Sequence, residues 1–388
     1  MSTFRKRFSR RDFVKVVSST AFSVPFLAAC ADKAEETAAV ETGGEETTLV
    51  EGARGMQWLP PEEPELKDIT TSLTNPNFYT VAPWHMMNDY GYIEEEGFDS
   101  MEFLVSNEAF QGVVSKEITV SQVDVDETMV AMNEGVPIVA IATHRDHEWH
   151  MFGLAPGITK PEDLIGKDAI MGTPGTRSFV QRQREIIAWS DGKVDPAVDM
   201  NPIVLSGGSD AYHQAIVSGQ VAIGSQYIRH IKPLLDAGAT FFIAGIFEFP
   251  QENMMVHADT VKESPRTIVN FLRAWLKSLN HWYDWNAKED IKALMLEKHE
   301  LELTQEFDDA WSGQVEMMAP NGMFRQIAMR FFLDNLKEFD VIGKDQNYGD
   351  FFDTSFLRQA QYELYGLAWP PQTPQDIFTK YNMPPGSF

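Results

Sequence analysis

Segments of strand length alternate with helical segments along most of this 388-residue chain. Residues 67–73 alternate apolar and polar side chains and end in a Thr-Asn-Pro-Asn turn, after which a helix is predicted over residues 78–96. Further strands are predicted near residues 100–106, 118–122 and 137–142, with short helices between them. This alternation predicts a parallel sheet with helices on both faces.

A second alternating block follows residue 151. It predicts strands over residues 168–172, 221–225 and 241–247, one helix that ends near Trp189 and another over residues 211–218. From Pro265 onward the pattern is mostly helical. Because one domain usually takes about 100–200 residues, we expect two α/β lobes, residues 67–145 with 248–388 and residues 146–247. The chain would cross between the lobes near residues 143–149 and 245–249.

The two blocks share one local pattern. Residues 114–122 read Val-Ser-Lys-Glu-Ile-Thr-Val-Ser-Gln, and residues 217–225 read Val-Ser-Gly-Gln-Val-Ala-Ile-Gly-Ser. Each is predicted to be the end of a helix, a tight turn and a buried strand. Two lobes of like topology would produce this repeat, and so would chance, since such junctions are common in α/β folds.

The first 30 residues have the pattern of an export signal. Ser-Arg-Arg-Asp-Phe-Val-Lys at residues 9–15 resembles the twin-arginine signal, and Leu-Ala-Ala-Cys at residues 27–30 resembles a lipobox. The apolar segment between them is too short to span a bilayer. We therefore expect residues 1–30 to be a signal segment and Cys30 to carry the lipid that anchors the protein to the outer face of the cell membrane. An amphipathic helix with a buried cysteine is the alternative, and it would not explain two motifs in this order.

Residues 31–66 are rich in Glu, Thr, Ala and Gly and end in a stretch with three prolines. This composition cannot bury a core, and it predicts a flexible tether. The whole chain has 32 Lys and Arg against 57 Asp and Glu, a formal net charge of −25. Such a chain repels polyanions, so no nucleic-acid partner is expected. Cys30 is the one cysteine, which excludes an intrachain disulfide and a thiolate metal cluster.

Four segments together resemble the periplasmic solute-binding proteins of the nitrate, alkanesulfonate and thiamine-pyrimidine-precursor type. They are the Asn-Pro-Asn-Phe-Tyr turn at residues 75–79 with the helix end at 88–98, Met-Asn-Glu-Gly-Val-Pro-Ile-Val at 132–139, Lys-Pro-Glu-Asp-Leu-Ile-Gly-Lys at 160–167, and Phe-Phe-Asp-Thr-Ser-Phe-Leu at 351–357. The resemblance implies a two-lobed type II periplasmic-binding-protein fold with a ligand cleft between the lobes. It also implies a binding protein that delivers a small anionic or heteroaromatic molecule to the permease of an ABC importer.

The chain departs from that family at two strand starts. The family often has an aspartate there, whereas Thr119 and Ala222 stand at these places in this chain. The identity of the ligand is therefore not transferred from any member of the family.

Ligands of open α/β sheets bind beyond the carboxyl ends of the strands. The segments near those ends supply the candidate ligand-binding residues: Asn75, Asn77, Phe78, Trp84, Gln122, Asp124, Thr173, Gly175, Thr176, Arg177, Ser178, Tyr227 and Glu248. At residues 173–178 a glycine permits close approach of the backbone, and free amides at a helix start favour an anion. Arg177 adds a bidentate donor for a carboxylate, sulfonate or phosphate.

Several of these residues have a second interpretation. Residues 173–178 could be an ordinary turn with a surface arginine, and Trp84 could be a core residue. Asp124 and Asp126 either receive an amine or are simply solvated.

Three histidines, His144, His147 and His150, recur at three-residue spacing. Imidazoles are zinc ligands, but this spacing also suits one face of a helix. We expect polar hinge or cleft-rim residues here, with no metal and no other cofactor.

The sequence contains no nucleophile-elbow, zinc-protease or phosphate-loop motif. We therefore expect a monomeric binding protein and no enzyme activity. Two alternatives remain, a ligand-sensing protein that serves a signalling receptor and an exported enzyme on the same fold. A neighbouring gene for an ABC permease would favour the importer, and one for a histidine kinase would favour the sensor.

Overall fold

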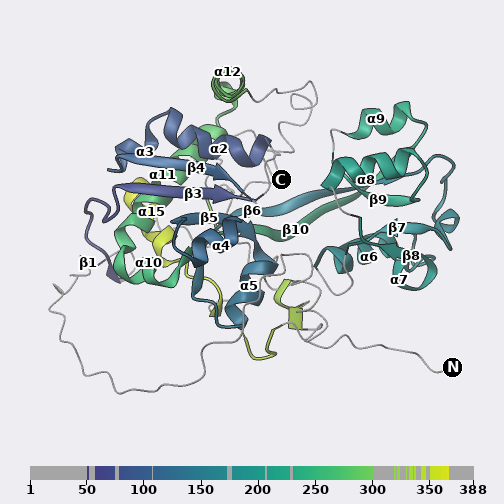
Figure 1. Cartoon of the computed structure of the whole chain (residues 1–388), viewed down its shortest axis with the longest axis horizontal. Coiled ribbons are helices and arrows are strands. Elements are labelled where there is room, and N and C mark those ends of the chain that lie inside the picture. The colour runs from purple at the N-terminus through teal and green to yellow at the C-terminus, as the bar shows by residue number, and fades with distance from the viewer. Residues whose placement is uncertain are drawn as a thin grey trace. The chain divides into compact units, whose positions relative to one another are not determined.

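The computed structural model (Figure 1) describes residues 50–51, 57–74, 78–106, 108–172, 177–205, 208–227, 230–300, 319, 321–323, 329, 332–334, 336–337, 342–346 and 350–366. The chain divides into two units, Met1–Pro61 and Glu62–Phe388. In the first unit, β1 (Val50–Glu51) pairs antiparallel with β2 (Gln57–Trp58). The predicted signal segment, Cys30 and most of the predicted tether lie outside the described residues.

The second unit is built around an eight-stranded sheet with the strand order β4-β3-β5-β10-β6-β9-β7-β8. At one end β3 pairs in parallel with β4 and β5, and at the other end β7 pairs in parallel with β8 and β9. The two middle strands run antiparallel to each other and to the strand beside each of them. The strands are β3 (Asp68–Leu73), β4 (Ser100–Val105), β5 (Val120–Asp124), β6 (Ile138–Leu154), β7 (Asp168–Ile170), β8 (Asn201–Ile203), β9 (Ile223–Gln226) and β10 (Thr240–His257).

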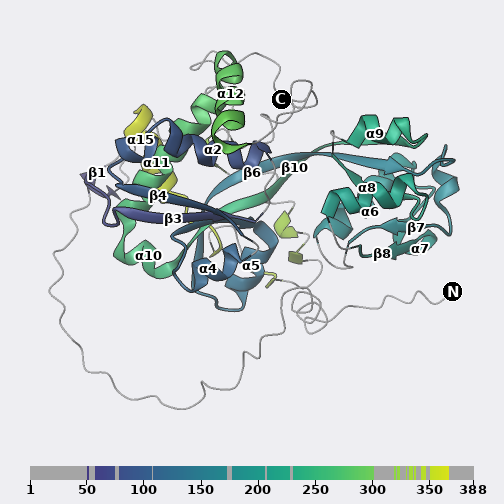
Figure 2. The same ribbon diagram turned by 45° about the horizontal axis from the view of Figure 1, so that its top comes forward.

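The middle strands β6 and β10 join the two parallel groups. They have 17 and 18 residues, about three times the usual strand length of 5–6. Figure 2 shows both strands running from the β3–β5 group to the β7–β9 group. We predicted shorter strands with a crossing beside each, whereas the structure places each crossing inside a strand. Polar residues at the crossings interrupt the apolar pattern from which strands are predicted. The strands nevertheless continue there, because each supplies backbone hydrogen-bond partners for the other.

A bulge interrupts the pairing at the crossing. Glu248 of β10 faces His147 of β6, and Glu252 faces Arg145, so four residue steps on β10 lie opposite two on β6. Pro250 lies in this stretch. Proline has no N–H to donate to a ladder, and a bulge is one of the few places in a sheet that accepts it.

Helices cover both parallel groups. Those that alternate with β3–β5 are α2 (Phe78–Asp89), α3 (Tyr92–Glu95), α4 (Ala109–Val114) and α5 (Val125–Asn133). Those that alternate with β7–β9 are η2 (Pro161–Leu164), α6 (Arg177–Trp189), α7 (Pro196–Asp199), α8 (Gly208–Val217) and α9 (Ile231–Asp236). After β10 come α10 (Ala258–Glu263), α11 (Pro265–Trp282), η4 (Trp285–Ala287), α12 (Lys288–His299) and α15 (Ser355–Tyr365).

The chain after β10 returns to the first group of strands and helices. Ser278 Oγ of α11 donates to the carbonyl of Pro83 in α2 at 2.6 Å. Arg273 of α11 pairs with Glu96 directly after α3, and its Nη1 lies 2.7 Å from Glu363 Oε2 of α15. The structure therefore has two α/β halves, the first completed by residues from the far end of the chain. The predicted residue boundaries at 145/146 and 247/248 fall within β6 and β10 and stay a prediction.

The predicted end of the tether at residue 66 lies later than the start of contact with the body. Pro64 is buried, and the carboxylate of Glu65 accepts the backbone N–H groups of Arg266 and Thr267 at 3.0 and 2.6 Å. The carbonyl of Glu62 accepts Arg266 Nε at 3.0 Å. Residues 62–66 are thus attached to the start of α11, where Glu65 satisfies two open helix amides and Glu62 binds the Arg266 side chain.

A second segment from late in the chain covers the other edge of β6. The backbone N–H of Thr143 donates to Gly322 at 2.8 Å, and the N–H of Ala319 donates to His144 at 3.0 Å. Asp353 donates likewise to the carbonyl of Ala140 at 2.9 Å. These bonds satisfy backbone groups that would otherwise form an exposed strand edge.

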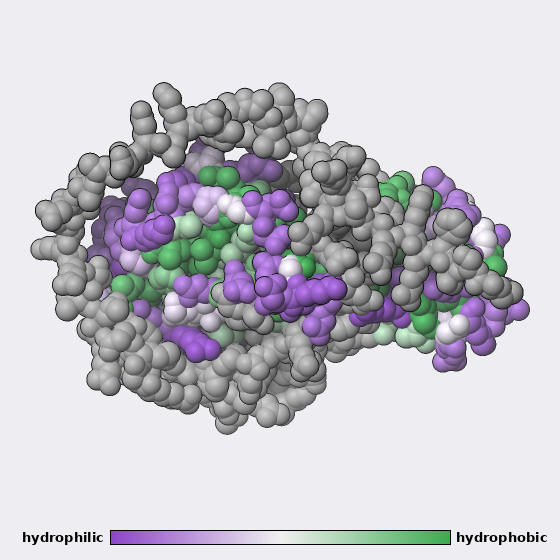
Figure 3. All heavy atoms as spheres, turned by 90° about the horizontal axis from the view of Figure 1, so that it is seen from below, coloured by the Kyte–Doolittle hydropathy of each residue, from purple (hydrophilic) through white to green (hydrophobic). Residues whose placement is uncertain are grey.

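The described surface is mixed in character. Figure 3 shows hydrophilic residues beside smaller hydrophobic areas. Several of the exposed large apolar side chains belong to the second half: Ile165, Val198, Val204, Leu235 and Ile243. Among the described residues, no helix combines the length and the apolar character needed to cross a membrane.

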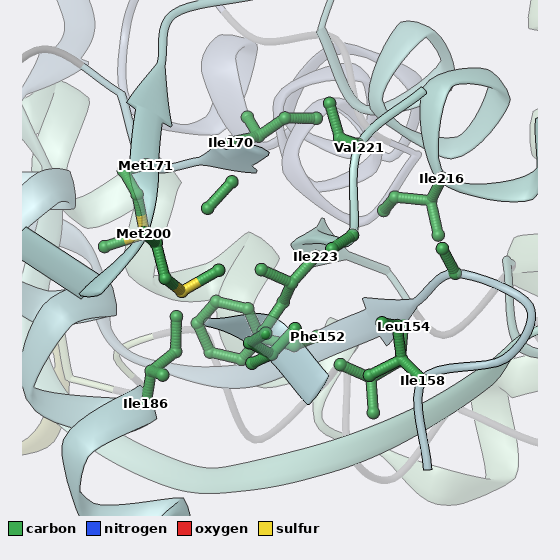
Figure 4. Packing of buried hydrophobic residues seen from close by; sticks show 14 of the residues in the cluster. Phe152, Leu154, Ile158, Ile170, Met171, Ile186, Met200, Ile216, Val221 and Ile223 are labelled. Carbon is green, nitrogen blue, oxygen red and sulfur yellow. The ribbon is translucent and has the colours of Figure 1, made fainter. Parts of the chain in front are cut away.

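Each half has buried apolar residues of its own. In the second half Phe152 of β6, Ile170 of β7 and Ile223 of β9 pack with Ile186 of α6 and Ile216 of α8 (Figure 4). In the first half a smaller cluster joins α4, β5 and the ends of β6 and β10: Ala109, Val113, Ile118, Val123, Ile138 and Met255. The two clusters lie toward opposite ends of β6, as two lobes require.

The repeated local pattern is the same in both halves. α4 and α8 end at Val114 and Val217, and a turn with left-handed backbone follows, at Lys116 (φ 65°) and at Gly219 (φ 73°). Each turn leads into a buried strand, β5 or β9. The predicted helix–turn–strand junctions are confirmed.

Candidate functional site

Four polar side chains form a buried network where β5, β6 and β10 meet. Gln122 lies on β5, His144 and Arg145 lie on β6, and Glu252 lies on β10. Glu252 Oε2 accepts from Gln122 Nε2 at 2.5 Å. The same oxygen is 3.1 Å from Arg145 Nε and 3.3 Å from His144 Nδ1. The ladder explains this convergence, since Glu252 faces β5 at Asp124 and β6 at Arg145.

The network contains an ion pair that is buried at the crossing between the two halves. All four residues are fully buried, and a buried ion pair is favourable only when its hydrogen bonds are well made. Burial lowers the pKa of His144, against the opposing effect of its hydrogen bond to Glu252. The neutral imidazole leaves Arg145 and Glu252 as the two opposite charges. Removing one partner of such a pair typically costs about 3–5 kcal/mol.

Trp84 on α2 lies in the core, which was the alternative to its predicted contact with a ligand. The residue is fully buried, and its ring stacks on Phe103 at a centroid distance of 5.6 Å and an interplanar angle of 9°. The ring of Trp275 lies 5.3 Å away, and that of His144 lies 6.4 Å away. Trp84 therefore packs directly against the buried network, and within the described part of the chain its Nε1 makes no hydrogen bond.

Three other predicted residues lie at strand or helix ends. Asp124 ends β5, is exposed and precedes α5. Tyr227 directly follows β9, and its backbone N–H donates to His230 Nδ1 at 3.4 Å. Ser178 is partly buried in the first turn of α6. These are the positions at which an α/β sheet presents ligand contacts; their contact with a ligand stays a prediction.

The remaining predicted site residues fall into two groups. Those outside the described residues are Asn75, Asn77, Thr173, Gly175 and Thr176. Three others have described backbones only, Phe78 at the start of α2, Arg177 at the start of α6 and Glu248 in β10. Arg177 therefore begins a helix, as the anion-site prediction requires.

The three spaced histidines lie on a strand. We considered a helical face for this spacing, but β6 contains all of them. Alternating side chains put residues three apart on opposite faces of a strand. His144 bonds to Glu252, whereas His150 bonds to Glu185 of α6. Among the described residues no group of His, Cys, Asp and Glu forms a metal-binding cluster.

Most of the polar residues that the fold gathers near the crossing are not among the predicted site residues. They include Arg145, Glu185, Ser225, Glu252 and Asn253. A signal was present for some of them: Arg145 follows the apolar run of residues 138–142, and Glu252 precedes the apolar run of residues 254–256. A charged residue that stands in line with a buried apolar strand indicates an oppositely charged or hydrogen-bonding partner from another part of the chain.

The sequence model of the NMT1/THI5-like family matches residues 80–285, which is more than half of the chain. The matched range begins in α2 and runs through both crossings of the sheet to η4. No curated protein sequence matches the chain.

Solved structures share the fold. The periplasmic nitrate-binding protein NrtA from Synechocystis PCC 6803 has a TM-score of 0.60 and 12% identity, over 80% of this chain and 93% of that chain. A putative periplasmic sulfonate-binding protein, SsuA from Methylobacillus flagellatus KT, has a TM-score of 0.58 and 14% identity, over 80% and 99%. A Candida albicans protein with the generic periplasmic binding protein fold has a TM-score of 0.53 and 12% identity, over 76% and 95%. The predicted two-lobed fold is confirmed.

Proposed function

The chain belongs to the NMT1/THI5-like family, and from this premise we propose that it is an extracytoplasmic solute-binding protein that delivers a small molecule to an ABC importer. One observation carries the proposal: strand ends of both halves flank the same stretch of β6. Asp124, which ends β5, faces Glu252 and through it Arg145, while Gln226, which ends β9, faces Met151. A ligand beyond these strand ends would contact both halves at once.

The proposed ligand is a small anionic or heteroaromatic molecule. Two of the proteins that share the fold are described as nitrate-binding and sulfonate-binding. In this chain Arg177 begins α6, and the amides of a helix start together with a guanidinium are the chemistry that holds an oxyanion. Closure of two lobes around such a ligand would create the shape that a permease recognises.

The proposed location follows from the signal-like segment. The twin-arginine motif would carry the protein across the membrane, and acylation of Cys30 would hold it there. Mature lipoproteins with two or more acyl chains are stably anchored. The protein would then act as a monomer beside its permease.

The proposal is tested by ligand binding to the mature protein. Thermal unfolding is followed with nitrate, alkanesulfonates, thiamine-pyrimidine precursors, aromatic carboxylates and flavins, one at a time. A ligand at 100 times its Kd stabilises the folded state by about 2.7 kcal/mol, so one chemical class should raise the melting temperature well above the others. Titration calorimetry of that class should give one site per chain. The absence of binding across all classes would contradict the proposal.

Arg177→Ala tests the anion site directly. Removing a charged hydrogen-bonded partner should weaken binding of the selected ligand by about 2–5 kcal/mol, or roughly 30- to several-thousand-fold. Arg184→Ala is the matched control, because Arg184 is an exposed arginine of the same helix and its loss should leave the Kd unchanged. If Arg177→Ala changes the Kd less than about threefold, Arg177 is a surface residue.

A further inference from the structure

Four side chains of the second half form a hydrogen-bonded array: Ser225, His150, Glu185 and Gln181. Ser225 Oγ of β9 lies 3.1 Å from His150 Nε2 of β6. The other ring nitrogen, His150 Nδ1, is hydrogen-bonded to Glu185 Oε2 of α6. Gln181 Nε2, one helical turn earlier, donates to Glu185 Oε1 at 3.0 Å. Both oxygens of the carboxylate are therefore held in place.

The array has one consistent arrangement of hydrogens when Glu185 is ionised and His150 is neutral. An ionised carboxylate only accepts hydrogen bonds, so His150 Nδ1 must carry the hydrogen that Glu185 receives. In the neutral imidazole Nε2 then has a lone pair, and the hydroxyl of Ser225 is the donor. This is the order of roles, nucleophile, base and orienting carboxylate, that activates a serine.

Exposure to solvent increases from the carboxylate through the imidazole to the hydroxyl. Glu185 is 2% exposed and His150 is 8% exposed, whereas Ser225 is partly exposed. The ring of Phe152 meets the His150 ring edge-on at 5.0 Å and limits its rotation. His150 is thus held in place and largely shielded from water, while Ser225 is exposed enough for a small molecule to reach its hydroxyl.

We propose that Ser225 is an activated nucleophile that reacts with small carboxylic esters, with His150 as its general base and Glu185 as the positioning residue. Ser225 Oγ bonds to the acyl carbon while its proton moves to His150 Nε2. The ester C–O bond breaks, and the leaving alcohol takes that proton. Water then attacks the acyl-serine by the same route and releases the carboxylic acid.

The position of Ser225 relates this activity to the fold. The residue lies one position before the end of β9 and two before Tyr227. It is therefore near the carboxyl end of the strand, where the second half would contact a ligand. An ester captured between the halves would present its acyl group there. The proposal rests on the geometry of the second half alone and does not depend on which solute the protein delivers.

The test is covalent labelling of the mature protein with a fluorophosphonate probe. The P–F bond breaks, a P–O bond forms to Ser225 Oγ, fluoride leaves, and the proton goes to His150. Peptide mass spectrometry should place the probe on Ser225, and Ser225→Ala should not be labelled. Ser218→Ala is the control, because Ser218 is an exposed serine at the end of α8 that donates to the carbonyl of Ala215, and its loss should leave the labelling rate unchanged.

Variants of the partners separate activation from simple accessibility. General-base catalysis contributes about 10²–10⁴-fold, so His150→Ala should slow labelling at least about 100-fold, and added imidazole should restore part of it. Glu185→Gln should slow labelling and abolish a far-downfield proton resonance from His150 Nδ1–H. Circular dichroism confirms folding of each variant. Failure to label Ser225 in the folded wild type, or labelling that is unchanged in both partner variants, would overturn the proposal.

Discussion

Single residues at the crossing are charged where the surrounding strands are apolar. Arg145 and Glu252 are fully buried, and each follows or precedes an apolar run in its own strand. Glu252 gathers Gln122, His144 and Arg145 around one oxygen because β10 lies between β5 and β6. At this scale the tertiary fold joins four polar residues from three strands into one network.

His85 is a residue whose titration should affect stability. Its ring, on α2, stacks on His299 of α12 with centroids 3.6 Å apart. Burial, and next the charge of His299, lower the pKa of His85 from 6.5 to about 4. The unfolded chain therefore binds a proton at pH values where the folded protein does not. The contribution of His85 to stability should therefore be full above about pH 6.5 and should fall as the pH decreases toward 4.

The measurement is urea unfolding at a series of pH values between these limits. His85→Gln should reduce by about one the number of protons taken up on unfolding within this range. His144 and His281, whose pKa values burial also lowers, keep part of the slope in the variant. Equal proton uptake by the variant and the wild type would show that His85 does not titrate differently in the two states.

At the scale of elements, α11 begins with a cap from 201 residues earlier in the chain. The residue before its first turn, Ser264, makes no side-chain capping bond. Glu65 supplies the missing acceptors, with Oε1 at 3.0 Å from the N–H of Arg266 and Oε2 at 2.6 Å from the N–H of Thr267. Its negative charge also interacts favourably with the positive N-terminal end of the helix dipole. The helix is thus completed by a residue that its own sequence does not contain.

Glu65→Ala should lower the free energy of unfolding by about 1–2 kcal/mol, since it removes a charged helix cap. The midpoint of urea unfolding measures the loss. Glu63→Ala is the control: Glu63 is exposed and its ion pair with Lys67 is solvent-accessible, so its loss should cost less than about 1 kcal/mol. Equal effects of the two substitutions would rule out the cap as the source of stability.

At the scale of the whole molecule, the globular body and the proposed anchor lie in separate parts of the chain. Residues 62–388 form the body, and the signal-like motifs lie wholly before it. We predict that Cys30→Ala yields a folded protein that is released from the membrane, because the acyl chains have no attachment point. Membrane fractionation and labelling with a radioactive fatty acid measure this.

A matched pair of substitutions tests the export route. Replacing both Arg10 and Arg11 by lysine keeps the charge but removes the twin-arginine motif, so the precursor should remain inside the cell. Replacing Arg5 and Arg7 by lysine leaves the motif intact and should permit export. Unchanged lipid labelling of Cys30→Ala would contradict the anchor, and normal export of the Arg10/Arg11 variant would contradict the route.

Strand and helix periodicity was enough to predict two α/β halves, because each period reflects which side of an element is buried. It also located β3, β4, β5, β7 and β9 to within a few residues. It did not predict that β6 and β10 continue through the crossing, because the polar residues there interrupt the apolar pattern. Asp124 and Tyr227 do lie at strand ends, where their contact with a ligand stays a prediction, whereas Trp84 lies in the core.

The sequence by itself determined the alternation of elements, the acidic balance and the motifs around Cys30, since these depend on local order and composition. Only the tertiary structure decided which distant residues meet: Ser225 with His150 and Glu185, Glu65 with the start of α11, and Glu252 with Arg145. The physical reason is that hydrogen bonds and ion pairs act over a few ångströms. Such contacts join residues 35 to 202 positions apart, and no local pattern records which partners strand pairing and helix packing will bring into range.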